Sequence, residues 1–224
     1  MPNTYEVVFV GTRKIENVKS LITNKIVFMP IIHTLEKVDA LVFTSAYAIR
    51  SLIESASHNP CLLHWKNIPS FVISPASAQI LYDEGAVVEF VGKKAHGEAF
   101  AREICPLLQE RKVLYLRAKE IVSGLDAILK DNHIDFDEVI AYENIPQSLP
   151  LKLKPKPKSV IIFSAPSAYH SFVKNFGWES QYVAVAIGQS TLSHFDKHMR
   201  AYVSPSPNFT TCIEFAQNLA LNLQ

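Results

Sequence analysis

The sequence predicts an α/β protein of two lobes, each a parallel sheet flanked by helices, with a two-stranded connector between them. Three observations predict this. Short apolar runs rich in Val, Ile and Phe alternate with amphipathic stretches of helical length. The pattern of the first half recurs in the second half. A Ser or Thr stands at several points where a strand gives way to a helix.

The apolar runs are expected to be strands, because continuous apolar runs are typical of parallel strands buried on both faces. In chain order they are Tyr5–Val10, Lys25–Phe28, Ala40–Phe43, Ser70–Ile73, Val87–Phe90, Lys112–Leu116, Glu138–Ala141, Val160–Phe163, Val183–Ile187 and Ala201–Val203. The stretches expected to be helices are Ala46–Ala56, Ala76–Asp83, Glu98–Gln109, Ser167–Asn175 and Thr210–Asn222.

The two halves resemble each other in order and spacing. The run that ends at Phe43 recurs at Phe163, the one that ends at Ile73 recurs at Ile187, and Val91 corresponds to Val203. The offsets are 120 residues (43 to 163), 114 (73 to 187) and 112 (91 to 203). A nearly constant offset indicates two copies of one unit. Residues 1–30 are expected to form a strand–helix–strand unit with no copy in the first half.

These patterns predict a discontinuous first lobe, residues 1–31 plus 148–224, and a second lobe of residues 34–144. The connectors are expected near residues 30–37 and 140–147. The segment Leu149–Lys158 is rich in Pro and Lys, which breaks regular structure and suits a connection.

Composition limits the function classes. With 224 residues, of which 48% are hydrophobic, the chain is long enough for one large or two small domains. A formal net charge of +1 argues against a general nucleic-acid binder. Three cysteines without a CxxC pair favour neither a disulfide framework nor a cysteine–zinc site. With no leader pattern and no apolar run of about 20 residues, a cytoplasmic protein is expected, with no nucleic-acid or membrane partner.

The Ser and Thr residues at the starts of helices are the candidates for ligand binding. They are Thr44, Ser45, Ser74, Ser77, Ser164, Ser190 and Thr191. One interpretation is that they only cap helices. The other is that helix N-termini at the carboxyl ends of parallel strands bind anions, here several carboxylates of one ligand in a cleft. Arg13 and Arg117 follow apolar strands at the same expected edge and are the cationic candidates.

Familiar catalytic motifs are absent from the sequence: it holds no GxSxG, no GxGxxG and no Walker loop. His194 and His198 are four residues apart, but no third ligand stands near them, so an exposed pair is favoured over a metal site. The sequence therefore indicates an enzyme or binding protein that works by orienting its ligand.

The order of the motifs resembles the uroporphyrinogen-III synthase family over nearly the whole chain. The segments that carry the resemblance are Val42–Ser45, Val72–Ala78, Val113–Arg117, Val139–Tyr142, Ile162–Ala168, Ala186–Thr191 and Val203–Pro207. The chain departs from the family pattern at Ser74 and Ala118, where glycine is usual, and at Ser77, where threonine is usual.

The resemblance implies a two-lobed hydro-lyase without metal or organic cofactor, working as a monomer in heme biosynthesis. Its substrate would be hydroxymethylbilane, a linear tetrapyrrole with eight carboxylates, which closes into uroporphyrinogen III with ring D inverted and water lost. The substrate cyclises unaided to the non-inverted isomer, so the enzyme mainly orients it. In the family a tyrosine after V-x-x assists departure of the hydroxyl, and the matching residue is Tyr142. A non-catalytic small-molecule-binding or regulatory protein of the same fold is the alternative interpretation.

Overall fold

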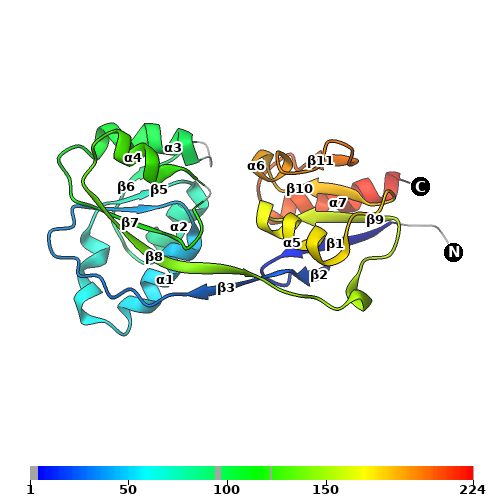
Figure 1. Ribbon diagram of the computed structural model, residues 1–224, viewed down its shortest axis with the longest axis horizontal. Helices are drawn as coiled ribbons and strands as arrows, with labels where there is room; N and C mark the ends of the chain where they lie inside the picture. Colours follow the sequence, from blue (N-terminus) through cyan, green and yellow to red (C-terminus); the bar gives the residue numbers. More distant parts are fainter. Residues whose placement is uncertain (1–4, 94–96, 122, 224) are drawn as a thin grey trace. The chain divides into compact units, whose positions relative to one another are not determined.

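The structure is a computed structural model of the chain, and it describes residues 5–93, 97–121 and 123–223. By its internal contacts the chain divides into two units, whose helices and strands are labelled in Figure 1. Unit 1 comprises Met1–Lys25 and Ile145–Gln224, and unit 2 comprises Ile26–Asn144. Each is an α/β unit built on a sheet that is parallel or almost entirely parallel, as the sequence predicts.

The chain crosses between the units within two strands. It leaves unit 1 after Lys25, inside β3 (Asn24–Phe28), and returns after Asn144, inside β8 (Phe136–Pro146). The first crossing precedes the segment 30–37 in which it was expected. The reason is that β3 is itself one half of the connector and is paired with β8. Two backbone bonds of 2.8 Å, from Met29 N to Ala141 O and from Gln147 N to Thr23 O, show that the pairing is antiparallel.

The sheet of unit 2 has the strand order β3-β8-β7-β4-β5-β6. Its other strands are β4 (Ala40–Phe43), β5 (Ser70–Val72), β6 (Val88–Val91) and β7 (Val113–Ala118). The five strands β8 to β6 are mutually parallel. All four residues of β4 are buried, as expected for a strand in the middle of a sheet covered on both faces.

Helices cover both faces of this sheet. On one face α1 (Ala46–Ala56) and α2 (Pro75–Asp83) pack over a core that includes Leu41 and Phe43. On the other face α3 (Gly97–Ile104) and α4 (Leu125–Asp131) pack over a core that includes Val42 and Tyr115. Two 3-10 segments complete the unit, η1 (Pro60–Asn67) and η2 (Cys105–Leu107).

The sheet of unit 1 is parallel throughout, in the order β11-β10-β9-β1-β2. The strands are β1 (Glu6–Gly11), β2 (Lys19–Ile22), β9 (Ser159–Phe163), β10 (Val183–Ala186) and β11 (Ala201–Val203). Helix α5 (Pro166–Phe176) packs on one face and α7 (Phe209–Asn222) on the other. The short elements are α6 (Gln189–Leu192) and η3 (Leu151–Leu153).

The two sheets have the same spatial order of strands, apart from β3. The order β8-β7-β4-β5-β6 of unit 2 matches β2-β1-β9-β10-β11 of unit 1, so β4, β5 and β6 correspond to β9, β10 and β11. The remaining two strands also correspond, β7 to β1 and β8 to β2. The expectation that residues 1–30 have no counterpart was therefore wrong: β1 and β2 are the counterparts of the last two strands of unit 2.

Two details of the expected elements were also wrong. Described residues 5–30 hold three strands and no helix, because Asn17 takes a left-handed φ of 59° that ends any helical turn, and Lys19 then pairs with Val8. The helix expected over Glu98–Gln109 ends as an α-helix at Ile104 and continues as 3-10, because Pro106 has no N–H for the α-helical ladder.

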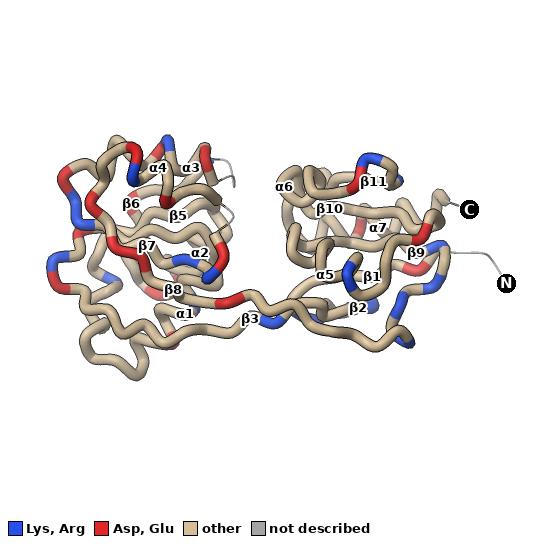
Figure 2. The backbone as a smooth tube through the Cα atoms, in the orientation of Figure 1, with Lys and Arg blue, Asp and Glu red and all other residues tan. Residues whose placement is uncertain are grey.

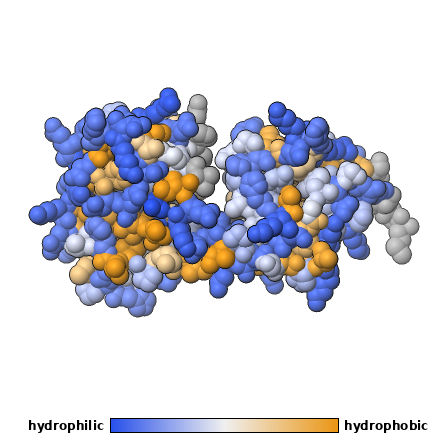
Figure 3. All heavy atoms as spheres, in the orientation of Figure 1, coloured by the Kyte–Doolittle hydropathy of each residue, from blue (hydrophilic) through white to orange (hydrophobic). Residues whose placement is uncertain are grey.

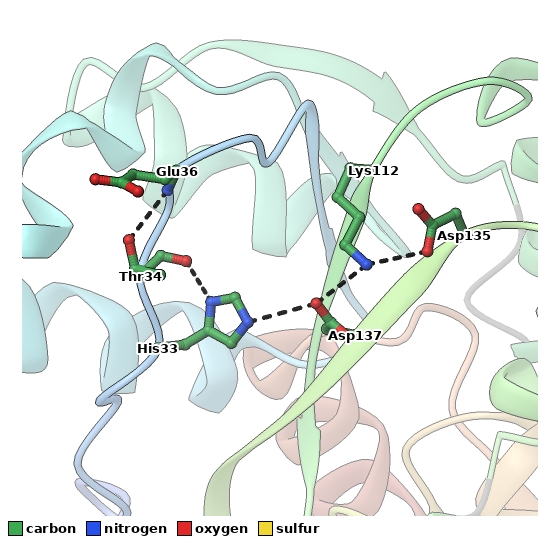
Figure 4. A network of polar contacts seen from close by, with 6 residues as sticks. All are labelled: His33, Thr34, Glu36, Lys112, Asp135 and Asp137. Atoms are coloured by element: carbon green, nitrogen blue, oxygen red, sulfur yellow. Dashed lines mark hydrogen bonds and ion pairs between the residues drawn. The ribbon is translucent and has the colours of Figure 1, made fainter.

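A network of polar side chains lies at the amino ends of β7 and β8 (Figure 4). Lys112 Nζ lies 3.0 Å from Asp135 Oδ1 and 3.2 Å from Asp137 Oδ2, and His33 Nε2 lies 3.6 Å from the same Asp137 oxygen. His33 also contacts the carbonyl of Thr34. The network connects the segment after β3 to the amino ends of β7 and β8.

Charges of both signs are interspersed on each unit (Figure 2), in keeping with the net charge of +1. The face drawn in Figure 3 is mostly hydrophilic, with small hydrophobic areas on both units. Within the described part of the chain, no helix is long and apolar enough to cross a membrane.

Candidate active site

The site begins where β4 ends in unit 2. Phe43 is the last strand residue, and Thr44 and Ser45 lead into α1. Ser45 has extended backbone angles, and its Oγ accepts a hydrogen bond of 3.1 Å from Tyr47 N, so it is the N-cap of the helix. The capping interpretation therefore holds for Ser45, whose hydroxyl also has a second partner.

That second partner is Tyr142, which comes from β8, two strands away from β4 in the sheet. Its ring lies 5.5 Å from the ring of Tyr47, and its hydroxyl interacts with the Ser45 side chain. The residue is 9% exposed. Burial raises the pKa of Tyr142 above its ordinary value, and the interaction with Ser45, which lowers the pKa of the phenol, offsets part of that rise. The phenol is therefore protonated at neutral pH and can donate a hydrogen bond.

A second tyrosine reaches the same turn. The Tyr115 hydroxyl lies 3.1 Å from Thr44 Oγ1 and 3.3 Å from Ser123 Oγ. Sequence analysis did not single out Tyr115 or Ser123. The signal was weak, because a tyrosine inside an apolar strand has the pattern of an ordinary core residue and its partners are 71 and 8 residues away.

Ser74 and Ser77 lie at the start of α2. Ser74 Oγ accepts a bond of 3.3 Å from Ser77 N and lies 3.2 Å from Ser77 Oγ, so the two hydroxyls serve each other and the cap. Ser77 is only 2% exposed. Of the pair, Ser74 is the more accessible.

Arg117, near the carboxyl end of β7, is held by its own surroundings. Its guanidinium donates to the carbonyls of Ala118 and Lys119 and to Glu138 Oε2 at 3.1 Å. Its Nε is buried and has no hydrogen-bond partner in the structure. Most of its donors therefore hold the end of the strand in place.

In unit 1 the corresponding edge carries Arg13 and Ser164. Arg13 is exposed just after β1, and its guanidinium carbon lies 4.6 Å from the centre of the Phe209 ring. Ser164 Oγ donates a bond of 3.0 Å to Val10 O, so it ties β9 to β1 and does not cap α5. The N-cap of α5 is Ala165, which has no side-chain cap bond.

The remaining candidates lie at the start of α6. Gly188 is the N-cap and also lacks a side-chain bond. Ser190 is exposed, whereas Thr191 is only 3% exposed and points into the protein. Ser190 is thus the accessible hydroxyl here.

His194 does not pair with His198. Its Nδ1 lies 3.0 Å from Nε2 of His170 on α5. No group of three or more His, Cys, Asp or Glu residues suited to a metal ion occurs in the described part of the chain.

Comparison with known proteins bears on the function of the residues at the carboxyl ends of the strands. A family model described as uroporphyrinogen-III synthase HemD matches residues 4–214. The chain is similar to uroporphyrinogen-III synthetase from Helicobacter pylori 26695, with 37% identity and a TM-score of 0.81 over 96% of this chain and 99% of that chain. No curated protein sequence matches it.

A mutant uroporphyrinogen III synthase from the extremely thermophilic bacterium Thermus thermophilus shares 13% identity, with a TM-score of 0.71 over 98% of this chain and 100% of that chain. At that identity the likeness shows the fold alone. The family match and the H. pylori structure confirm the resemblance that the order of motifs predicts. The chain belongs to the uroporphyrinogen-III synthase family.

Proposed function

We propose that the chain performs the reaction of its family with Tyr142 as the acid. The reaction cyclises hydroxymethylbilane to uroporphyrinogen III, with ring D inverted and one water lost. The observation that supports the role of Tyr142 is the place of its buried phenol, which packs against Tyr47 of α1 at the carboxyl ends of the strands. In open α/β sheets this is the edge where ligands bind.

The acid has one step to assist. When the bond between the terminal carbon and its hydroxyl breaks, the oxygen takes the bonding electrons and needs a proton to leave as water. Tyr142 O–H provides that proton, and the proton that the substrate releases on ring closure restores the phenol. Ser45 stabilises the intervening phenolate by donating its own hydroxyl hydrogen. Atoms therefore balance, with water as the only by-product.

The carboxylates of the substrate need donors. On unit 2 the accessible candidates are the hydroxyls of Thr44 and Ser74, and on unit 1 they are Arg13 and the hydroxyl of Ser190. Buried Ser77 and Thr191 would contribute through their helix turns and not through their hydroxyls. Arg117 and Ser164 would act by holding the strand ends that carry these donors.

We also propose that the enzyme works as a cytoplasmic monomer. In support, all three cysteines are free and Cys61 is exposed, which suits a reducing compartment. Light scattering on the purified protein should give a mass near the 25.1 kDa of one chain. A stable dimer at micromolar concentration would contradict this.

The reaction itself is tested by adding purified protein to hydroxymethylbilane and separating the uroporphyrinogen isomers by chromatography. We expect the inverted isomer to dominate, against the non-inverted isomer in a blank without enzyme. If the product mixture equals that of the blank, the protein binds at most and the proposed activity is wrong.

Tyr142→Phe tests the acid. Removal of the hydroxyl should lower kcat by roughly 10²–10⁴-fold, the usual contribution of general acid–base catalysis. Because orientation remains, substrate that turns over on the enzyme should still give mainly the inverted isomer, while unaided closure of free substrate adds the other isomer. Tyr82→Phe, on the exposed face of α2, is the matched control and should keep wild-type kcat. Wild-type turnover in a folded Tyr142→Phe protein would show that Tyr142 only packs against Tyr47.

A further inference from the structure

Tyr115 combines a fully buried ring with a hydroxyl that reaches the candidate site. The residue is 1% exposed, and its ring belongs to the core under α3 and α4. The hydroxyl lies within hydrogen-bond distance of Thr44 and Ser123. Two hydroxyl partners match the one donor and the acceptor capacity of a phenol, so the group is satisfied inside the protein.

The packing of the core does not need this hydroxyl. Tyr115 pairs with Val42 of β4, and Phe9 pairs with Ile162 of β9 in the corresponding place of unit 1. Both rings face the equivalent side of their sheets. Phenylalanine fills the position in one unit, whereas the other unit has a phenol, which costs free energy to desolvate.

The two tyrosines meet one turn from opposite faces of the sheet. Tyr142 belongs to the core under α1 and α2, and Tyr115 to the core under α3 and α4. Their partners, Ser45 and Thr44, are consecutive residues. The side chain of Thr44 is therefore fixed by one phenol and that of Ser45 by the other.

Tyr115 also fixes the segment that follows β7. Ser123 Oγ accepts a bond of 3.4 Å from Leu125 N at the start of α4. Gly97 packs so closely on Ser123 that an added Cβ would lie 2.6 Å from Ser123 O. The hydroxyl thus connects the turn after β4 with the segment before α4.

We propose that Tyr115 is a positioning residue for Tyr142. Its hydroxyl fixes Thr44, and through the Thr44–Ser45 turn it sets the place of the Ser45 oxygen that holds Tyr142. This inference rests on the proposed function and names the residue that organises its acid. Positional shifts of an ångström or less at a reacting group are costly to rate, so the effect is catalytic as well as structural.

The test is Tyr115→Phe, which keeps the ring and removes the oxygen. We expect kcat to fall about 3- to 10-fold, the range for loss of one neutral hydrogen bond, with KM changed less than kcat. The fraction of non-inverted isomer should rise, because a slower acid step leaves more time for unaided closure. A loss of stability alone would move neither kcat per folded enzyme nor the isomer ratio.

Tyr182→Phe is the matched control. Tyr182 is also 1% exposed, and its hydroxyl donates 2.7 Å to Pro155 O in unit 1, away from the candidate site. It should lower the melting temperature as much as Tyr115→Phe does, while kcat and the isomer ratio stay at wild-type values.

A double-mutant cycle identifies the route of the effect. If Tyr115 acts through Thr44, then Tyr115→Phe combined with Thr44→Val should lose little more kcat than the larger single loss. If instead the fold-loss in kcat of the double variant equals the product of the two single losses, Tyr115 does not act through Thr44. If Tyr115→Phe is too unstable for kinetics, Ser123→Ala and Thr44→Val remove one partner each with the ring in place, and each should lower kcat.

The outcomes separate this inference from the proposed function. A wild-type protein that yields only the blank product mixture would refute the proposed function. A wild-type protein that makes the inverted isomer, with a folded Tyr115→Phe variant of equal kcat and isomer ratio, would refute the positioning role alone.

Discussion

At the scale of single residues, close packing leaves no room for a side chain at Gly92. An added Cβ there would lie 2.7 Å from the backbone oxygen of Ile73, and backbone cannot rotate away as a side chain can. Gly92 N also donates a bond of 2.8 Å to Val72 O, which fixes the distance between the segment after β6 and β5.

We therefore expect Gly92→Ala to destabilise the protein by about 1–3 kcal/mol, the usual cost of overpacking. Gly188→Ala is the control, because its Cβ would meet nothing closer than Pro207 Cβ at 3.8 Å and its φ of −163° suits any residue. Urea denaturation of both variants measures the difference. Equal urea midpoints for the two variants would mean that the backbone near Gly92 shifts to make room for the added methyl group.

Sequence patterns single out those candidate residues whose position depends on local structure. Thr44 and Ser45 follow from the change of strand to helix, and Tyr142 from the family motif. The partners of Arg117 and Tyr115 were not predictable, because Glu138 and Thr44 are distant in sequence and meet them only through strand pairing. Whether an Arg is free or already paired depends on such long-range register.

At the scale of elements, the two units start their corresponding helices differently. In unit 2, α1 and α2 begin at serines whose Oγ caps the helix. In unit 1, α5 and α6 begin at Ala165 and Gly188 without a side-chain cap. A helix start without a side-chain cap is less stable than a capped one.

Ala165→Asp should therefore raise the stability of the fold and weaken substrate binding. The extended backbone at Ala165, with φ −165° and ψ 161°, is that of an N-cap, so the carboxylate should stabilise the fold by about 0.5–1 kcal/mol. The same carboxylate would repel a substrate carboxylate bound near this edge, so KM should rise. Ala165→Ser, which caps without charge, should raise KM less. Steady-state kinetics with melting curves check both effects, and an unchanged KM would show that α5 does not bind substrate.

Element type was predictable where apolar runs were long, as in β4, β7 and β9. The strand Lys19–Ile22 was missed because it is short and half polar, and α4 because no clear cap precedes it: its N-cap is Gly124 with a left-handed φ of 63°. In both cases tertiary pairing, and not local propensity, determines the structure.

At the scale of the whole molecule, the chain contains the same sheet twice with the strands in a different chain order. The sequence offsets reveal three of the five matching strands, because β4 to β6 and β9 to β11 run in the same order. The other two matches are hidden, since β1 and β2 come first in unit 1 whereas β7 and β8 come last in unit 2. Only strand pairing reveals that the repeat is complete.

Both units hold buried groups that resist losing a proton. Burial raises the pKa of Cys212 to about 11 and that of Tyr182 to about 12 in unit 1. In unit 2, burial is also the main cause of the raised pKa of Cys105, Tyr115 and Tyr142. In each case the folded protein binds its proton more tightly than the unfolded chain does.

The sign of the pH dependence follows from this. Below the ordinary pKa of a thiol, near 8.5, both states keep the proton and the stability is fully present. As pH rises above that value, the unfolded chain releases the proton and the fold does not, so the free energy of unfolding falls until the folded group also titrates. We expect a level melting temperature from pH 7 to about pH 8.5, then a steady fall through pH 11.

Cys212→Ala isolates one part of that fall. The variant is less stable at every pH, because it loses the packing of one buried sulfur. Its free energy of unfolding should, however, fall by about 2–3 kcal/mol less than that of the wild type between pH 8.5 and 11, at about 1.4 kcal/mol per unit of pKa shift. The control is Cys61→Ala, whose exposed thiol has no burial to lose. Urea unfolding at pH 8 and at pH 10.5 gives the slope for each protein. If Cys212→Ala and Cys61→Ala lose the same free energy between these two pH values, the thiol of Cys212 does not keep its proton in the folded state and the alkaline loss has another origin.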